Sequence, residues 1–133
     1  MLEGAVYQLE HYFFTEICVR ANPDFNHSEA RKTEIRVAKN FIKDKDDPGR
    51  YGVAVRVSTE DSECNNTPYF FAIETYGYFR DEPDDIKEDS NCHEQEQLLI
   101  SAIREKLISL TARGPWGRYH FGHVLPPENG QAT

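Results

Sequence analysis

The sequence lacks long apolar runs and has few cysteines. No stretch approaches the about 20 consecutive apolar residues that a membrane-spanning helix requires, and the first residues lack the basic-then-apolar order of a signal peptide. The three cysteines, Cys18, Cys64 and Cys92, are odd in number and irregularly spaced, which is typical of free thiols in a reducing compartment. These absences predict a cytoplasmic globular protein that does not insert into membranes.

Positive charge is also scarce. The 133 residues include 15 Lys and Arg against 23 Asp and Glu, which gives a formal net charge of −8. Phosphate backbones are bound by clustered Lys and Arg, so this balance argues against nucleic acid as the main partner. The acidity either keeps the chain soluble or attracts a basic partner. We expect one domain over residues 1–133, which is long enough to bury about two thirds of its unfolded surface.

The recurrent motifs of catalysis and metal binding are missing. The sequence has no glycine-rich phosphate loop before a helix, and its densest acidic run, Asp81–Asp89, lacks the apolar neighbours that raise a carboxylate pKa. Asp44–Gly49 faintly resembles a calcium loop, but Pro48 occupies a position that requires an oxygen ligand. His120 and His123 form one loose pair, whereas structural zinc sites use paired short spacings. We therefore expect no enzyme, no cofactor and no metal site.

Aromatic residues, by contrast, are abundant, with eight Phe, seven Tyr and one Trp. Most must form the core, and any surplus is surface for a ligand or another subunit. Period-two alternation rich in aromatic and β-branched residues predicts strands at Ala5–Arg20, Lys32–Lys43, Arg50–Thr59 and Pro68–Phe79. In the first strand, strict alternation places on one side Tyr7, Leu9, His11, Phe13, Thr15, Ile17 and Val19.

The loop lengths predict how these strands are arranged. The second and third connections are short enough for antiparallel hairpins, and Asp44–Gly49 is read as a hairpin turn. The first connection is longer and suits a crossover, which would put the first strand beside the fourth and leave the second at an edge. The predicted fold is α+β, a four-stranded antiparallel sheet with a long C-terminal helix packed on one face.

The helix is predicted over about His93–Arg113. Ser90 or Asn91 can cap its start, and Gly114 supplies a left-handed stop that Pro115 reinforces. One apolar stripe, expected to face the sheet, contains Leu99, Ile103, Leu107 and Leu110. A second stripe contains Leu98, Ala102, Ile108 and Ala112. Either the tail folds over this second stripe, or Leu98, Ala102 and Ile108 form a subunit interface of a homo-oligomer.

Segments along the chain resemble the SecB family of bacterial protein-export chaperones. The longest is "LLISAIREKLISLTARGPWGRYHFGHVLPP", Leu98–Pro127, which is similar to the long helix of the family, its Arg/Gly stop and the extended segment that follows. "YQLEHYFFTEICVRANP", Tyr7–Pro23, is similar to the first strand and its exit, and "AIETYGYF", Ala72–Phe79, to the fourth strand. The order and spacing of these segments carry the resemblance, which covers about Tyr7–Pro127.

The resemblance implies an ATP-independent holdase that assembles as a dimer or a dimer of dimers and binds extended, non-native polypeptides in long grooves. Aromatic side chains suit such clients because they provide large contact area with little rotamer entropy to lose. On this reading the groove residues are Phe25, Tyr76, Tyr78, Trp116, Tyr119, Phe121 and Leu125. The alternative for Trp116, Tyr119 and Phe121 is that they simply cover the helix and the sheet edge.

The resemblance also bears on partners. SecB-like proteins bind the SecA motor ATPase partly through acidic residues on the exposed sheet face. Here the matching positions hold Glu16 and Arg20 in the first strand, and Phe70 and Ala72 in the fourth. Glu16 is therefore the one candidate contact, and we expect weak or absent binding to a SecA-like motor. The family's last helix has no counterpart after Pro127, so we expect a more open groove or another cover for it.

Other functions remain open at this point. A SecB-like chaperone can serve protein export, or it can protect one aggregation-prone antitoxin of a toxin–antitoxin pair. A small-molecule-binding or purely oligomeric protein on the same fold is the alternative from another class.

Overall fold

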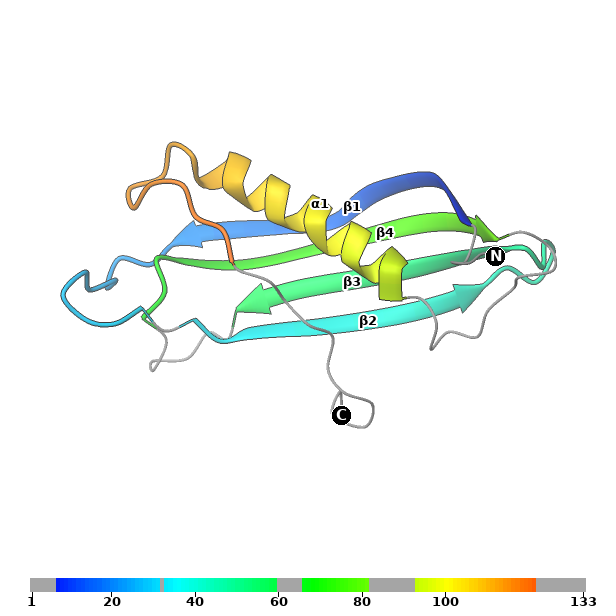
Figure 1. The fold of residues 1–133 in the computed structure, drawn as a ribbon. Helices are drawn as coiled ribbons and strands as arrows, with labels where there is room; N and C mark the ends of the chain where they lie inside the picture. The colour runs from blue at the N-terminus through cyan, green and yellow to red at the C-terminus, as the bar shows by residue number, and fades with distance from the viewer. Residues whose placement is uncertain (1–6, 32, 60–65, 82–92, 122–133) are drawn as a thin grey trace, which may run out of the picture.

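Four antiparallel strands form one sheet, and one helix lies across one of its faces (Figure 1). The computed structural model describes residues 7–31, 33–59, 66–81 and 93–121. Its elements are β1 (Tyr7–Ala21), β2 (Ile35–Lys43), β3 (Arg50–Thr59), β4 (Tyr69–Asp81) and α1 (His93–Thr111). The strand order β1-β4-β3-β2 places the first strand beside the fourth and the second at an edge, so the predicted α+β topology is confirmed.

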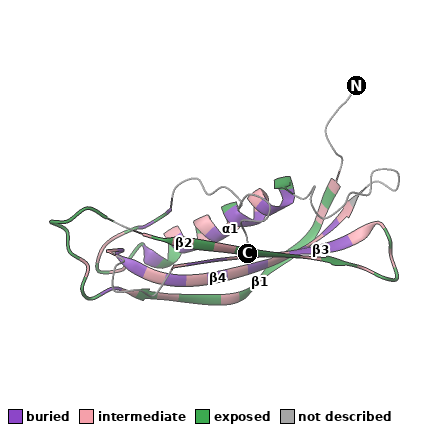
Figure 2. Ribbon diagram, turned by 90° about the horizontal axis from the view of Figure 1, so that it is seen from below, coloured by how far each residue is buried: buried purple, intermediate pink, exposed green. Residues whose placement is uncertain are grey.

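The hydrophobic core lies between α1 and the two central strands. Alternate residues of β3 and β4 face the helix and are buried, among them Val55, Val57 and Ile73. Figure 2 shows the buried positions concentrated on β3, β4 and α1, with β1 and β2 largely exposed. An antiparallel sheet needs cover on one face only, so its other face, called the open face here, is available to solvent.

The connection between β2 and β3 is the hairpin turn that the sequence predicts. The Asp46 backbone N–H donates to Asp44 Oδ1 at 2.9 Å, and the Arg50 N–H donates to the Asp47 carbonyl at 2.9 Å. Short-range bonds from Asp side chains to the backbone are the usual chemistry of such turns. The carboxylate of Asp44 therefore shapes the turn.

β1 departs from the strict alternation predicted for it. Its register with β4 shifts between Leu9 and His11 and again between Phe14 and Glu16. Each β-bulge inserts an extra residue and moves the following side chains to the other face. As a result Phe14 packs against the core, while Phe13 stacks on Tyr76 on the open face at 5.7 Å between ring centroids. The prediction that Phe13 shares a face with Tyr7 is therefore wrong.

α1 uses the predicted stripe except in its last turn. Leu99, Ile103 and Leu107 are fully buried, and Ile100 joins them. The assignment of Leu110 to this stripe is wrong, because its side chain is 46% exposed. α1 crosses the sheet obliquely, from β2 and β3 at its start to the side of β1 at its end (Figure 1). The last turn therefore overhangs an edge strand instead of lying over the centre of the sheet.

The residues assigned to a subunit interface are only half-buried in the single chain. They are Leu98, Ala102 and Ile108. Leu98 also packs against the edge of the core, so it is the least available of the set. Their role in an interface stays a prediction, and the predicted helix caps Ser90 and Asn91 lie outside the described residues.

The helix ends differently from the prediction at Gly114. The Gly114 N–H donates to the Thr111 carbonyl at 2.9 Å in a tight turn, and among the described residues the left-handed backbone belongs to Gly117, at φ 81°. Gly114 is required for space, because a Cβ there would collide with the ring of Tyr69. The Tyr69 hydroxyl donates to the Gly117 carbonyl at 2.7 Å. The turn that follows α1 is thus held against β4.

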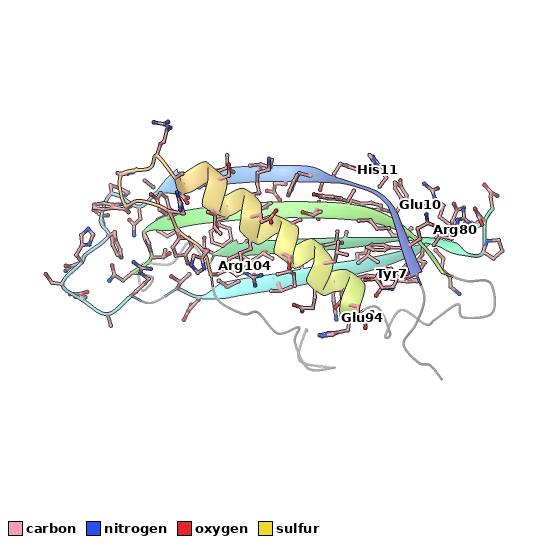
Figure 3. The ribbon with its side chains drawn as sticks, turned by 45° about the horizontal axis from the view of Figure 1, so that its top comes forward. Tyr7, Glu10, His11, Arg80, Glu94 and Arg104 are labelled. Carbon is pink, nitrogen blue, oxygen red and sulfur yellow. The ribbon has the colours of Figure 1, made fainter. Side chains whose placement is uncertain are left out.

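A charge network ties the hairpin turn to β1 and β4. Glu10 accepts from Arg50 Nε at 2.9 Å and from Arg80 Nε at 2.8 Å, and Arg80 also donates to Asp47. Figure 3 shows Glu10 and Arg80 at the same end of the sheet. Hydrogen bonds from the two guanidinium groups lower the pKa of Glu10, and those from Arg80 lower the pKa of Asp47.

This network predicts a specific acid sensitivity. A carboxylate whose pKa is lower in the folded state stabilises the fold above its unfolded pKa, about 4.3 for Glu, and that contribution is lost as the pH falls through the folded value. We expect the free energy of unfolding, measured by urea titration, to fall below about pH 4.5 in the native chain and to fall less in Glu10→Gln. The control is Glu105→Gln, which removes an exposed carboxylate of α1. If the free energy of unfolding fell equally with decreasing pH in the native chain and in Glu10→Gln, this account would be contradicted.

Candidate functional site

The residues predicted to line one groove lie in separate places. Tyr119 and Phe121 are buried, and Phe25 and Trp116 meet where the loop after β1 touches the tail. Tyr76 and Tyr78 lie on the open face, while Leu125 is outside the described residues. The structure therefore brings together pairs of these residues but no single groove that contains them all.

The tail aromatics Tyr119 and Phe121 are part of the core. They are 5% and 3% exposed, and Phe121 stacks on Phe71 with ring centroids 6.0 Å apart. The Tyr119 N–H donates to Thr111 Oγ1 at 2.9 Å, and the Arg104 guanidinium lies 4.9 Å from the Phe121 ring (Arg104 is labelled in Figure 3). The alternative that these two side chains cover the helix and sheet is the arrangement observed.

Phe25 and Trp116, both predicted to line the groove, are in direct contact with each other. Their ring centroids are 5.4 Å apart in an edge-to-face arrangement, and His27 packs on both. The Trp116 indole N–H donates to the Asn22 carbonyl at 2.9 Å, and the buried Asn22 side chain donates to the Thr67 carbonyl. Trp116 therefore fastens the loop after β1 to the tail.

Tyr76 and Tyr78 belong to an aromatic layer on the open face. Phe13 stacks on Tyr76, and the Arg50 guanidinium lies 4.2 Å from the Tyr78 ring centroid. The Tyr76 phenol packs against Gly52, where an added Cβ would collide with it. Partial burial raises the pKa of the Tyr76 hydroxyl. This layer faces away from α1 and from the tail.

The sequence patterns did not reveal an exposed apolar surface on the helix side of β1. It consists of Tyr12, Phe14, Ile17 and Leu110, called the β1 strip here. Tyr12, Ile17 and Leu110 are 43%, 48% and 46% exposed. A hollow of about 390 Å³ adjoins it between β1 and the end of α1, with Val19, Tyr69 and Pro115 among its lining residues. Strict alternation did not predict this surface, because the bulge between Phe14 and Glu16 puts Tyr12 and Ile17 on one face despite their odd spacing.

The strip runs beside an open sheet edge. β1 is at the end of the strand order, and among the described residues it pairs with β4 alone. An edge strand presents unpaired backbone N–H and C=O groups, which can pair with another extended chain. At 15 residues β1 is long for such an edge. Backbone pairing groups and apolar side chains are therefore available along the same line.

Glu16, the candidate motor contact, is engaged within the chain. Its carboxylate accepts from Arg56 Nε at 2.7 Å and from Arg56 Nη2 at 3.3 Å, and this pairing lowers the pKa of Glu16. A basic partner would have to compete with Arg56 for the carboxylate. The expected weakness of motor binding stays a prediction.

Neither a metal centre nor a membrane helix emerges from the part of the chain that the structure describes. Within residues 7–31, 33–59, 66–81 and 93–121, His, Cys, Asp and Glu do not gather in groups of three or more that could hold a metal ion. Within the same ranges, no helix combines the length and the apolar character needed to cross a membrane.

Comparison with solved structures shows the fold. The chain is similar to a SecB-like chaperone of Mycobacterium tuberculosis, solved with a ChAD peptide from the HigA1 antitoxin, with a TM-score of 0.68, 12% identity, and 92% of this chain and 93% of that one covered. A protein of unknown function from Streptococcus agalactiae is similar with a TM-score of 0.56 and 8% identity, over 91% of this chain and 100% of that one. No protein-family model and no curated protein matches the sequence. The chain thus has a SecB-like fold.

The burial of the tail gives a direct test of its structural role. Phe121→Ala should lower the free energy of unfolding by about 3 kcal/mol, because it removes a buried ring and leaves a cavity. Phe13→Ala removes a ring that is 38% exposed, so it should lower the free energy of unfolding clearly less. Urea unfolding followed by tryptophan fluorescence measures both. Similar losses for the two variants would show that Phe121 is not a core residue.

Proposed function

We propose that this chain is an ATP-independent chaperone that binds extended, non-native polypeptides along the β1 strip. The observation that carries the proposal is the coincidence of exposed apolar side chains with a long unpaired strand edge among the described residues. Monomeric proteins usually protect such an edge with charges, proline or another element. Here the helix side of the edge carries Tyr12 and Ile17 instead. The SecB-like fold supports the same class of function.

In the proposed mode of binding, an unfolded client adds as a strand beside β1. The hydrogen bonds of the added strand use only client backbone, so they do not depend on client sequence. Alternate client side chains then fall on the β1 strip, where each buried apolar group contributes about 25 cal/mol per Å² removed from water. This combination suits a holdase, because it recognises extended apolar chain and releases it once the chain folds.

The hollow at the end of α1 supplies the deepest point for an apolar client side chain. Its walls include Ile17 from β1, Leu110 from α1 and Pro115 from the turn after the helix. Farther along the strip the Lys106 ammonium lies 5.0 Å from the Phe14 ring centroid, which gives the strip a polar margin. An apolar centre with a polar rim is the usual layout of a protein-binding surface.

The range of clients separates two forms of this proposal. A chaperone in protein export accepts many unrelated clients, whereas an antitoxin chaperone holds one. The structure from Mycobacterium tuberculosis contains an antitoxin peptide, and this favours testing the second form here. A small-molecule-binding or purely oligomeric protein is the remaining alternative, and it predicts no holding of unfolded chains.

We also propose that the chain is a homo-oligomer. Leu98, Ala102 and Ile108 give the outer side of α1 a half-exposed apolar character. A second copy packed on this side would cover them and leave β1 open, so the two proposals are compatible in one assembly.

The chaperone proposal predicts loss of holding without loss of fold. Ile17→Ser with Leu110→Ser should weaken suppression of the aggregation of a reduced, unfolded protein by about tenfold or more, because two apolar contacts are lost. Both side chains are about half exposed, so the melting temperature should change little. The assay contains no nucleotide. Ile42→Ser is the matched control, since Ile42 is 42% exposed on β2, away from the strip.

Two results would overturn the proposal. One is a native chain that does not suppress aggregation, and the other is a double variant that retains full holding. Native mass spectrometry of the double variant shows whether weaker suppression of aggregation comes from lost client binding or from a changed number of subunits. Repeating the assay with several unrelated clients distinguishes a general holdase from a chaperone of one antitoxin.

The oligomer proposal has its own measurement. Leu98→Asp or Ile108→Asp should place a charge in a dry apolar contact, which costs several kcal/mol, and should therefore dissociate the assembly. Native mass measurement at micromolar concentration reports the number of subunits, with Glu105→Gln as a surface control on the same helix. A native chain that is monomeric under these conditions contradicts the proposal.

A further inference from the structure

The two bulges of β1 bracket a short, regular stretch in which every side chain carries a ring. His11–Phe14 pairs with β4 without interruption, and the register shifts lie directly before and after it. Consecutive side chains of a strand point to opposite faces, so this stretch presents rings on both faces of the sheet edge. Tyr12 and Phe14 belong to the β1 strip on the helix side, whereas His11 and Phe13 lie on the open face.

On the open face the rings form a continuous surface that reaches the sheet edge. The ring centroid of Phe13 lies 5.4 Å from that of His11, 5.7 Å from that of Tyr76 and 6.3 Å from that of Tyr78. His11 and Phe13 are both exposed, and the two tyrosines are half-buried beside them. The unpaired edge is therefore lined by rings on its open side as well as on its helix side.

Polar side chains limit this ring surface along β1. Glu10, which precedes it, accepts from Arg80 Nε at 2.8 Å on the open face. Thr15, which follows it, donates its hydroxyl to the Glu74 carboxylate. The helix side, by contrast, stays apolar as far as Ile17. The edge thus has rings on both faces only between the two bulges, and farther along β1 it is apolar on one face.

We propose that His11–Phe14 gives the chaperone a preference for client segments that are apolar on both faces. This inference rests on the proposed function, in which a client adds as a strand beside β1. A client side chain directly opposite Phe13 would then have its Cβ about 4.5–5.5 Å from the Cβ of Phe13. An apolar side chain at that position would remove ring surface from water on the open face too. A client with strict alternation would place polar side chains there and would gain nothing from Phe13.

The segment that fits this edge best is an uninterrupted apolar run about as long as His11–Phe14. Such runs are typical of strands that are buried on both faces in a folded protein, whereas half-buried strands alternate. Apolar segments of high β-propensity are also an aggregation hazard when they are exposed. The preference would therefore direct the chaperone to the segments whose exposure is most harmful. Phe13 is the specificity-determining residue, whereas Ile17 and Leu110 serve any apolar client.

The test compares the affinities of two short fluorescent peptides for the full chain. In the first peptide apolar and polar residues alternate, and in the second the two central polar residues are replaced by Val, which creates an uninterrupted apolar run. We expect the native chain to bind the second peptide about tenfold more tightly, because the added side chains contact Phe13 and His11. Phe13→Ser should abolish this difference by weakening the second peptide alone, whereas Phe13→Leu should preserve it.

Two further variants serve as controls. Ile42→Ser is the matched one, because Ile42 is an exposed apolar residue of the same face on the opposite edge strand. It should leave the ratio of the two affinities unchanged. Ile17→Ser with Leu110→Ser removes apolar contacts of the β1 strip, so it should weaken both peptides and keep their ratio.

The outcomes separate this inference from the chaperone proposal. Equal affinities of the two peptides for the native chain, or a ratio that survives in Phe13→Ser, would overturn the inference and leave the chaperone proposal standing. A native chain that binds neither peptide would overturn both. A smaller number of subunits in Phe13→Ser, measured by native mass spectrometry, would assign the rings to a contact with a second copy and would also overturn the inference.

Discussion

One helix has to cover a sheet that is larger than itself, and the rest of the structure depends on this mismatch. α1 has 19 residues and is about 28 Å long, whereas the 15 residues of β1 extend over about 50 Å. The helix therefore buries most of the helix side of β3 and β4 and covers the edge strands only in part. The tail extends the cover through Tyr119 and Phe121, and Trp116 ties the tail to the loop after β1. What remains uncovered on this side is the apolar edge at Tyr12 and Ile17.

The two faces of the sheet consequently differ in chemistry. On the helix side the uncovered positions are apolar, and they adjoin a strand edge that is unpaired among the described residues. On the open face, charged side chains are paired within the chain. The Arg50 guanidinium lies over the Tyr78 ring, and Glu16 forms an ion pair with Arg56. The open face can therefore remain in water without a partner, whereas the helix side gains free energy when an apolar chain covers it. This difference is why the proposed client surface lies on the helix side.

The bulges of β1 connect the sequence to this arrangement. With strict alternation, Tyr12 and Phe14 would share the open face with Glu16, and the helix side would carry His11 and Phe13. Two inserted residues bring Tyr12, Phe14 and Ile17 to one side instead. The same shifts put Phe13 onto Tyr76 on the open face. Bulges are common where a strand must change the direction of its side chains near a functional surface.

The sequence by itself determined the strands, the helix, the antiparallel order with its crossover, and the stripe Leu99, Ile103 and Leu107, because these follow from local periodicity and loop length. It could not determine which aromatic residues are core. Tyr119 and Phe121 are buried because residues distant in the chain, Phe71 and Thr111, meet them, while Leu110 is exposed because α1 crosses the sheet obliquely. The candidate sites were also decided only by tertiary structure. The β1 strip requires two bulges, and a bulge leaves no signal in the sequence of one strand alone.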